Sequence, residues 1–217
     1  YPNLKIEDGS RCVWMPRGGQ GVERNIALAM AKGARMRGAV REANRRIRER
    51  SEGMSKFGTA GGIPAAEPFG GLPLRNWQDG SWAEGAQAIS GEAIHDTIRV
   101  RDTACHACPV GCGKAVEVDE GPYAGTWGEG PEYETLCGFG GNLLIDDLPA
   151  LAAINARCND LGLDTISTSG VIAFATEALE RGVLGADDLD SVELAWGEPE
   201  PVLQMVEQIA HREGPGD

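Results

Sequence analysis

Residues 146–182 read DDLPALAAINARCNDLGLDTISTSGVIAFATEALERG, and this stretch decides the fold. Apolar residues recur in its first half at helical spacing, behind an aspartate pair that can cap a helix. Gly162 is placed to end this first helix, and a second helix is predicted from about Ser169 to Arg181. Two successive helices joined by a short polar turn predict a mainly α protein.

Each of these helices has an apolar stripe that we expect to face the core. The stripes are Leu151, Ile154, Cys158 and Leu161 in the first helix, and Val171, Phe174, Ala175 and Ala178 in the second. A third helix is predicted from about Pro201, with Val202, Met205, Val206 and Ile209 as its stripe. The predicted architecture is a multi-helix domain.

The part of the chain before residue 146 is more mixed. A long basic helix is predicted from about Val22 to Glu52, and a short helix from Ser90. Residues 114–118 alternate like a strand, and residues 123–127 can pair with them as a small β-hairpin near the cysteine-rich segment. We therefore divide the chain into an N-terminal segment, 1–54, and a helical domain, 55–217.

The 217 residues carry a net charge of −13 that is unevenly distributed. Residues 1–114 hold 17 basic and 12 acidic side chains, whereas residues 115–217 hold 3 and 21. The acidic half repels phosphate, so nucleic acid is not an expected partner. No apolar run approaches the roughly 20 residues that span a bilayer, so no membrane is expected either. The chain begins without Met and ends abruptly, which suggests a piece of a longer protein.

Three of the six cysteines lie within eight residues, in CHACPVGC at 105–112. Such short gaps favour shared metal ligation over mutual disulfides, and a reducing, cytoplasmic compartment. Thiolates are soft ligands that suit iron–sulfur clusters and zinc, and we favour an iron–sulfur cluster on Cys105, Cys108 and Cys112. Zinc and three metal-free thiols stay open as alternatives. Cys158 is expected in the core, and Cys137 is a candidate fourth ligand.

Two polar motifs follow the cysteines. The segment GPEYET at 130–135 places Glu132 and Glu134 two residues apart, where they suit acid–base chemistry or the start of a helix. The segment NDLGLD at 159–164 joins the two helices, and we name it the connector. Its polar groups suit either a heterocyclic ligand or a simple helix–turn–helix junction capped by Asp164.

CHACPVGC, GPEYET and the segment CNDLGLDTISTSGVIAFATEALERG occur in this order, after GTAGGIPAAEPFGGLPLRNWQDGSWAEGAQAISGEAI at 58–94. Together they resemble the tungsten-containing aldehyde ferredoxin oxidoreductase family. The resemblance covers about residues 55–217. It implies the middle portion of an enzyme that binds tungsten, or molybdenum, through two pterins beside one [4Fe–4S] cluster.

The resemblance also implies roles for particular residues. Cys105, Cys108 and Cys112 would bind the cluster, with the family's fourth cysteine and its catalytic histidine in a later domain, beyond Asp217. Glu134 is the nearest counterpart of the active-site glutamate, and Glu132 is the second candidate. The pterin-binding residues would be Asn159, Asp160, Gly162, Leu163 and Asp164, with Asn159 standing where the family has Asp.

The implied reaction is oxidation of an aldehyde to a carboxylic acid, with electrons passing through the cluster to ferredoxin or an electron-transfer subunit. The resemblance predicts that this chain alone is inactive, because the later ligands are missing from it. A second copy of the chain, in a homo-oligomer, is a further candidate partner. The alternatives are a non-catalytic iron–sulfur electron-transfer module and an interaction domain held together by zinc.

Overall fold

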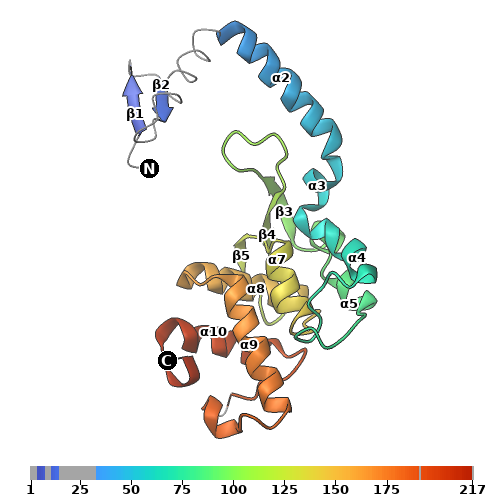
Figure 1. Cartoon of the computed structure of the whole chain (residues 1–217), viewed down its shortest axis with the longest axis vertical. Helices are drawn as coiled ribbons and strands as arrows, with labels where there is room; N and C mark the ends of the chain where they lie inside the picture. The colour runs from blue at the N-terminus through green and yellow to red at the C-terminus, as the bar shows by residue number, and fades with distance from the viewer. Residues whose placement is uncertain (1–3, 8–10, 15–32, 191, 217) are drawn as a thin grey trace. The chain divides into compact units, whose positions relative to one another are not determined.

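The computed structural model describes residues 4–7, 11–14, 33–190 and 192–216 (Figure 1). The chain forms two compact units, Tyr1–Arg50 and Ser51–Asp217. In the first unit, strand β1 (Leu4–Glu7) pairs antiparallel with β2 (Arg11–Trp14). The same unit contains the basic helix α2 (Gly33–Arg50). Residues 22–32 of the predicted helix lie outside the described residues.

Helix α2 is largely exposed along its described side chains, and ion pairs along its surface offset the repulsion between its arginines. Arg45 pairs with Glu42 at 2.8 Å and with Glu49 at 2.6 Å, and Arg46 pairs with Glu42 at 2.7 Å. Each pair joins residues three or four positions apart, the spacing at which helical side chains meet. Exposed pairs of this kind contribute little stability individually.

The second unit is mainly helical with one small sheet, as predicted. Its α-helices are α3 (Glu52–Phe57), α4 (Ile63–Ala66), α5 (Ala83–Ala88), α6 (Gly91–Asp96), α7 (Tyr133–Thr135), α8 (Leu148–Leu161), α9 (Thr165–Glu180) and α10 (Pro199–His211). Short 3-10 turns are η1 (Thr59–Gly62), η2 (Glu67–Phe69), η4 (Ala186–Leu189) and η5 (Gly214–Gly216), and η3 (Leu136–Gly141) is a π-helical turn. No helix in the described part of the chain is long and apolar enough to cross a membrane.

Helix α8 follows the predicted plan at both ends, and α9 does so at its C-terminal end. The carboxylate of Asp147 accepts a hydrogen bond from the backbone N–H of Ala150 at 3.1 Å and so caps α8. Gly162 ends α8 in the left-handed conformation, with φ of +71°. The predicted start of α9 at Ser169 was wrong, because Asp164 accepts a hydrogen bond from the N–H of Ser167 at 2.7 Å and begins the helix at Thr165.

The predicted inward face of α9 was half wrong. Ala175 and Ala178 are buried, but Val171 and Phe174 are 58% and 67% exposed. Apart from Ile172, the face that packs inward is built of small and polar residues, and α9 packs against η3. A Cβ added at Gly138 of η3 would lie 2.3 Å from the Oγ of Ser169, so the contact requires small residues on both sides. Hydrophobic periodicity does not include this steric requirement.

The small sheet has the order β3 (Arg99–Thr103), β4 (Gly113–Glu117), β5 (Trp127–Glu129), and all its pairs are antiparallel. The predicted strand at 114–118 is confirmed as β4. The predicted partner at 123–127 contributes only its last residue, Trp127, to β5. Strand β3 was not predicted, because its largely exposed sequence RVRDT lacks apolar alternation. The cysteine-rich segment forms the loop between β3 and β4 (Figure 1).

The core of the second unit is one continuous apolar cluster that links the helices to the sheet. Its largest fully buried members include Ile63, Leu74, Ile89, Phe139, Leu151, Ile154, Ile172 and Val202. The predicted stripe of α10 is confirmed at Val202, Met205 and Val206, and α10 packs against α8. Cys158 is fully buried in this cluster, as the helical stripe predicted.

The N-cap of α8 provides a test of this local structure. We expect Asp147→Ala to lower the free energy of unfolding by about 1 kcal/mol, because the N–H of Ala150 loses its acceptor. Asp146→Ala, one residue earlier and also exposed, is the matched control. Urea unfolding of the purified 217-residue chain measures both variants, and equal stabilities of the two would contradict the capping role of Asp147.

Candidate functional site

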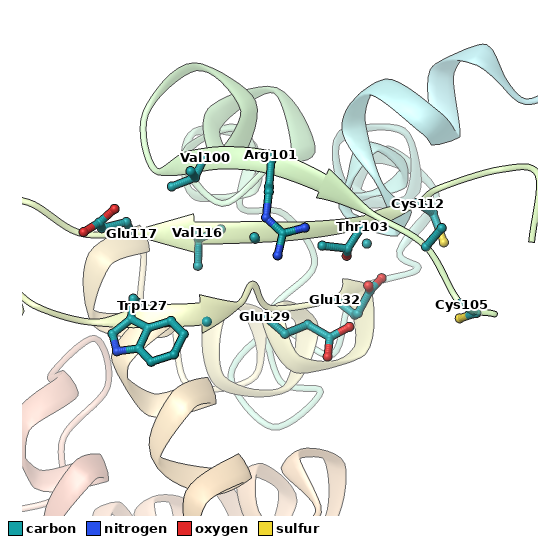
Figure 2. Close-up of a pocket in the computed structure, with 14 residues that line it drawn as sticks. Val100, Arg101, Thr103, Cys105, Cys112, Val116, Glu117, Trp127, Glu129 and Glu132 are labelled. Carbon is teal, nitrogen blue, oxygen red and sulfur yellow. The ribbon is translucent and has the colours of Figure 1, made fainter.

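A cavity of about 620 Å³ lies on the face of the β3–β4–β5 sheet (Figure 2). Its lining combines apolar, charged and sulfur-bearing groups: Val100, Arg101, Thr103, Ala104, Cys105, Cys112, Gly113, Ala115, Val116, Glu117, Trp127, Gly128, Glu129 and Glu132. In Figure 2, Cys105, Cys112 and Glu132 lie toward one end of the cavity, and Trp127 and Glu117 toward the other. A volume of this size is typical of ligand sites.

The cysteine loop, residues 104–112, supplies the sulfur groups. Cys105 is exposed, and Cys108 and Cys112 are partly exposed. The N–H of Cys108 donates to the carbonyl oxygen of Cys105 at 3.0 Å, and Ala107 and Gly111 adopt positive φ angles of 59° and 67°. Two left-handed residues so close together curl the loop, which brings Cys105 and Cys112 to the same cavity.

The donor set of this loop fits a soft metal centre. Three thiols on a curled, accessible loop are the ligand type that iron–sulfur clusters use. Within the described residues, no group of three or more His, Cys, Asp or Glu side chains lies close enough together to hold a metal ion. The fit of the loop to a cluster therefore rests on its residue types and on their spacing in the sequence.

Cys137 and Cys158 have a different environment from the loop cysteines. Both are buried in the apolar core, and neither lines the cavity. Burial raises the pKa of each thiol to about 11. A desolvated thiol of this kind is a poor nucleophile and a poor metal ligand. The core position of Cys137 gives no support to the idea that it is the fourth ligand.

The two glutamates of GPEYET diverge, because the motif forms the start of helix α7. Glu132 is the N-cap of α7 and lines the cavity, where its carboxylate accepts a hydrogen bond from the hydroxyl of Thr59. The same hydroxyl accepts from the N–H of Tyr133 at 2.9 Å. Glu134 lies in the first turn, is exposed, and does not line the cavity. The helix N-terminus considered for this motif is therefore present.

The connector forms the turn between α8 and α9. Asn159, Asp160 and Asp164 are exposed, and Leu163 is partly buried. Asp164 is the cap of α9, and hydrogen bonds from Ser167 lower its pKa. The capping role that the sequence suggested for Asp164 is therefore present.

A hydrogen bond joins the GPEYET motif to the first residue of α9, directly after the connector. The hydroxyls of Thr135 and Thr165 lie 2.9 Å apart, and α7 packs against α9. Glu134 and Asp164 each directly precede one of these threonines. Helix α7 therefore has Glu132 on the side of the cysteine cavity and places Glu134 next to the connector in the fold.

Sequence reasoning missed several residues that shape the site. Arg101 and Trp127 both line the cavity. Arg101 lies on β3, which was not predicted, and Trp127 lies on β5, whose predicted bounds were displaced. Thr59 orients Glu132 from 73 positions away, and no local pattern indicates that contact. Trp127 is 77% exposed in the structure, and the signal available in the sequence was a tryptophan at the end of the expected strand 123–127.

The family described as aldehyde ferredoxin oxidoreductase, domains 2 & 3, matches residues 38–217. Two curated relatives named tungsten-containing aldehyde ferredoxin oxidoreductase, from Thermococcus kodakarensis and Pyrococcus furiosus, are each 41% identical over 166 residues. Each match covers 76% of this chain and 27% of the relative. The chain belongs to the aldehyde ferredoxin oxidoreductase family, and it spans about a quarter of the length of these relatives.

Two further similarities show the breadth of related proteins. A P. furiosus protein named aliphatic sulfonate oxidoreductase, WOR-like subunit, is 31% identical over 162 residues, which is 74% of this chain and 26% of that protein. Among solved structures, the active-site complex BamBC of benzoyl coenzyme A reductase, in complex with 1,5-dienoyl-CoA, matches with a TM-score of 0.51 and 28% identity. That match covers 64% of this chain and 20% of the solved chain.

The contrast between loop and core cysteines predicts a pattern of thiol reactivity. In the metal-free chain at pH 8, iodoacetamide should modify Cys105, Cys108 and Cys112 rapidly and leave Cys137 and Cys158 unmodified until the chain unfolds. The two core thiols react slowly because burial keeps them protonated and inaccessible. Peptide mass spectrometry identifies each site, and rapid native-state labelling of Cys158 would contradict its core position.

Proposed function

We propose that this chain is part of a tungsten-pterin oxidoreductase that converts an aldehyde and water to a carboxylic acid. The reaction releases two protons to solvent and two electrons, and the electrons pass through a [4Fe–4S] cluster to ferredoxin or an electron-transfer subunit. The observation that carries the proposal is the curled cysteine loop opening on the same cavity as Glu132. Family membership supports it independently. The proposed location is the cytoplasm.

The cysteine loop and the connector would hold the two cofactors. Cys105, Cys108 and Cys112 would bind the cluster through their thiolates. The connector residues Asn159, Asp160, Gly162, Leu163 and Asp164 would bind the pterin of the tungsten or molybdenum centre. The donors and acceptors of this exposed turn match the amide-like edges of a pterin. When bound, the metal centre supplies the two-electron oxidation of the substrate.

The two glutamates are proposed for different tasks. Glu134, exposed and next to the connector in the fold, would accept a proton from water or orient the aldehyde carbonyl. Glu132 would act on the cavity side, where the hydroxyl of Thr59 holds its carboxylate. The fixed geometry of α7 keeps the two carboxylates apart, so that one side chain does not replace the other.

Metal analysis of the intact, anaerobically expressed gene product tests the cofactor proposal. We expect about four irons per chain, the content of one [4Fe–4S] cluster, together with tungsten or molybdenum. Cys105→Ala should lose most of the iron, whereas the matched control Cys158→Ala should retain it, because Cys158 is a core residue. Zinc without iron or pterin would support the zinc-held interaction domain instead, and iron without pterin the electron-transfer module.

Turnover assays test the role of Glu134. We expect Glu134→Gln to retain iron and tungsten or molybdenum but to lose about 10²-fold or more in kcat, the contribution typical of general acid–base catalysis. Glu132→Gln tests the second candidate, and Glu193→Gln, at an exposed glutamate outside the motifs, is the control. Undiminished aldehyde oxidation by Glu134→Gln would remove Glu134 from the mechanism.

A further inference from the structure

Lys114 has a position that the site described so far does not explain. It is the second residue of β4 and lies two positions after Cys112 in the sequence. Its side chain is only 6% exposed, and among the described residues it is the one buried lysine or arginine. Burying an ammonium group is costly unless hydrogen bonds and an opposite charge compensate it. Its partners therefore indicate what the burial achieves.

Carbonyl oxygens on both sides of Cys112 surround the ammonium group. The Nζ of Lys114 donates to the carbonyl oxygen of Gly111 at 3.4 Å and to that of Gly113 at 3.4 Å. It also donates to the carbonyl oxygen of Ser55 at 2.8 Å, just before the end of α3. Lys114 thus ties the end of the cysteine loop to a separate helix, within the same compact unit.

The charge of Lys114 is balanced by Asp102, its cross-strand neighbour in the β3–β4 ladder. Their Nζ and Oδ1 atoms lie 3.2 Å apart, and Asp102 also pairs with Arg99 at 2.8 Å. The hydrogen bond from Arg99, aided by Lys114, lowers the pKa of Asp102 to about 2, so Asp102 is ionised at neutral pH. The cluster Arg99, Asp102 and Lys114 carries one net positive charge next to the cysteine loop.

A positive charge at this place has an electrostatic consequence. Reduction adds an electron to a cluster that already carries negative thiolate ligands, so nearby positive charge stabilises the reduced form. A buried charge is screened less by water and salt than an exposed one. The acidic groups that line the cavity, the exposed Glu117 and Glu129 and the partly buried Glu132, act in the opposite direction.

We propose that Lys114 is a positioning residue that holds the Cys112 end of the cysteine loop and raises the reduction potential of the cluster through its fixed positive charge. The inference rests on the proposed function, because it assumes that a cluster binds to this loop. Lys114 acts through the loop and its field, and no contact with the substrate is required.

A redox titration of the intact holoprotein, followed by electron paramagnetic resonance, tests the electrostatic part. At the wild-type midpoint potential, Lys114→Met should lower the ratio of reduced to oxidised cluster about tenfold, a negative shift of about 59 mV for a one-electron couple. Lys114→Arg keeps the positive charge, so its reduction potential should stay close to that of the wild type. Asp102→Asn should shift the potential in the positive direction. Arg181→Met, which removes an exposed positive charge on α9's C-terminal cap, is the control and should shift nothing.

The opposite signs of the potential shifts expected for Lys114→Met and Asp102→Asn distinguish an electrostatic effect from structural damage. A purely structural role would shift the two variants Lys114→Met and Asp102→Asn in the same direction, or would cost iron without a shift, and either result overturns the electrostatic proposal. An unchanged potential in Lys114→Met that retains its full iron content also overturns it.

Hydrogen–deuterium exchange of the metal-free 217-residue chain tests the positioning part without any cofactor. The peptide covering residues 104–112 should exchange about tenfold faster in Lys114→Met than in wild type or Arg181→Met, because the loop loses charged hydrogen-bond partners. Unchanged exchange would refute the positioning role. A wild-type holoprotein without iron would refute the proposed function, and the exchange result would still decide whether Lys114 holds the loop.

Discussion

The close contact between η3 and α9 is the constraint on which the arrangement of the site depends. Gly138 and Ser169 approach so closely that a Cβ at position 138 would lie 2.3 Å from the serine oxygen. This contact brings α7, which directly precedes η3, to the start of α9. A hydrogen bond of 2.9 Å between the hydroxyl oxygens of Thr135 and Thr165 then joins the two helices. Without small residues at this contact, the GPEYET motif and the connector would separate, and the proposed division of work between the glutamates would lose its geometric basis.

The cysteine loop depends on a second set of interactions, which are electrostatic. Lys114 contacts the carbonyls of Gly111 and Gly113 on either side of Cys112, the carbonyl of Ser55 and the carboxylate of Asp102. A single buried ammonium group thus joins the end of the cysteine loop to α3, β3 and β4. The loop itself is otherwise accessible, as the proposed cluster site requires.

Several parts of the fold and site were predictable because their signals are local. Asp147, Gly162 and Ser90 act as caps through neighbours three or four residues away, so the helix ends could be inferred from spacing alone. The cysteine cluster was equally visible, because its members lie within eight residues. By contrast, β3 was missed because an exposed edge strand needs no apolar alternation, and its pairing with β4 depends on a loop whose shape no propensity describes.

By itself, the sequence determined the mainly α class, the three long helices of the second unit and the presence of a thiol-rich loop beside acidic motifs, because each of these depends on residues close together in the chain. Only the tertiary structure decided that α9 turns Val171 and Phe174 outward and that Glu132 and Glu134 diverge. Only the tertiary structure, likewise, showed that Lys114 lies beneath the cysteine loop. The physical reason is that steric fit and buried charge depend on partners up to tens of residues away in sequence, such as Ser55 and Ser169, whose distances no periodic pattern contains.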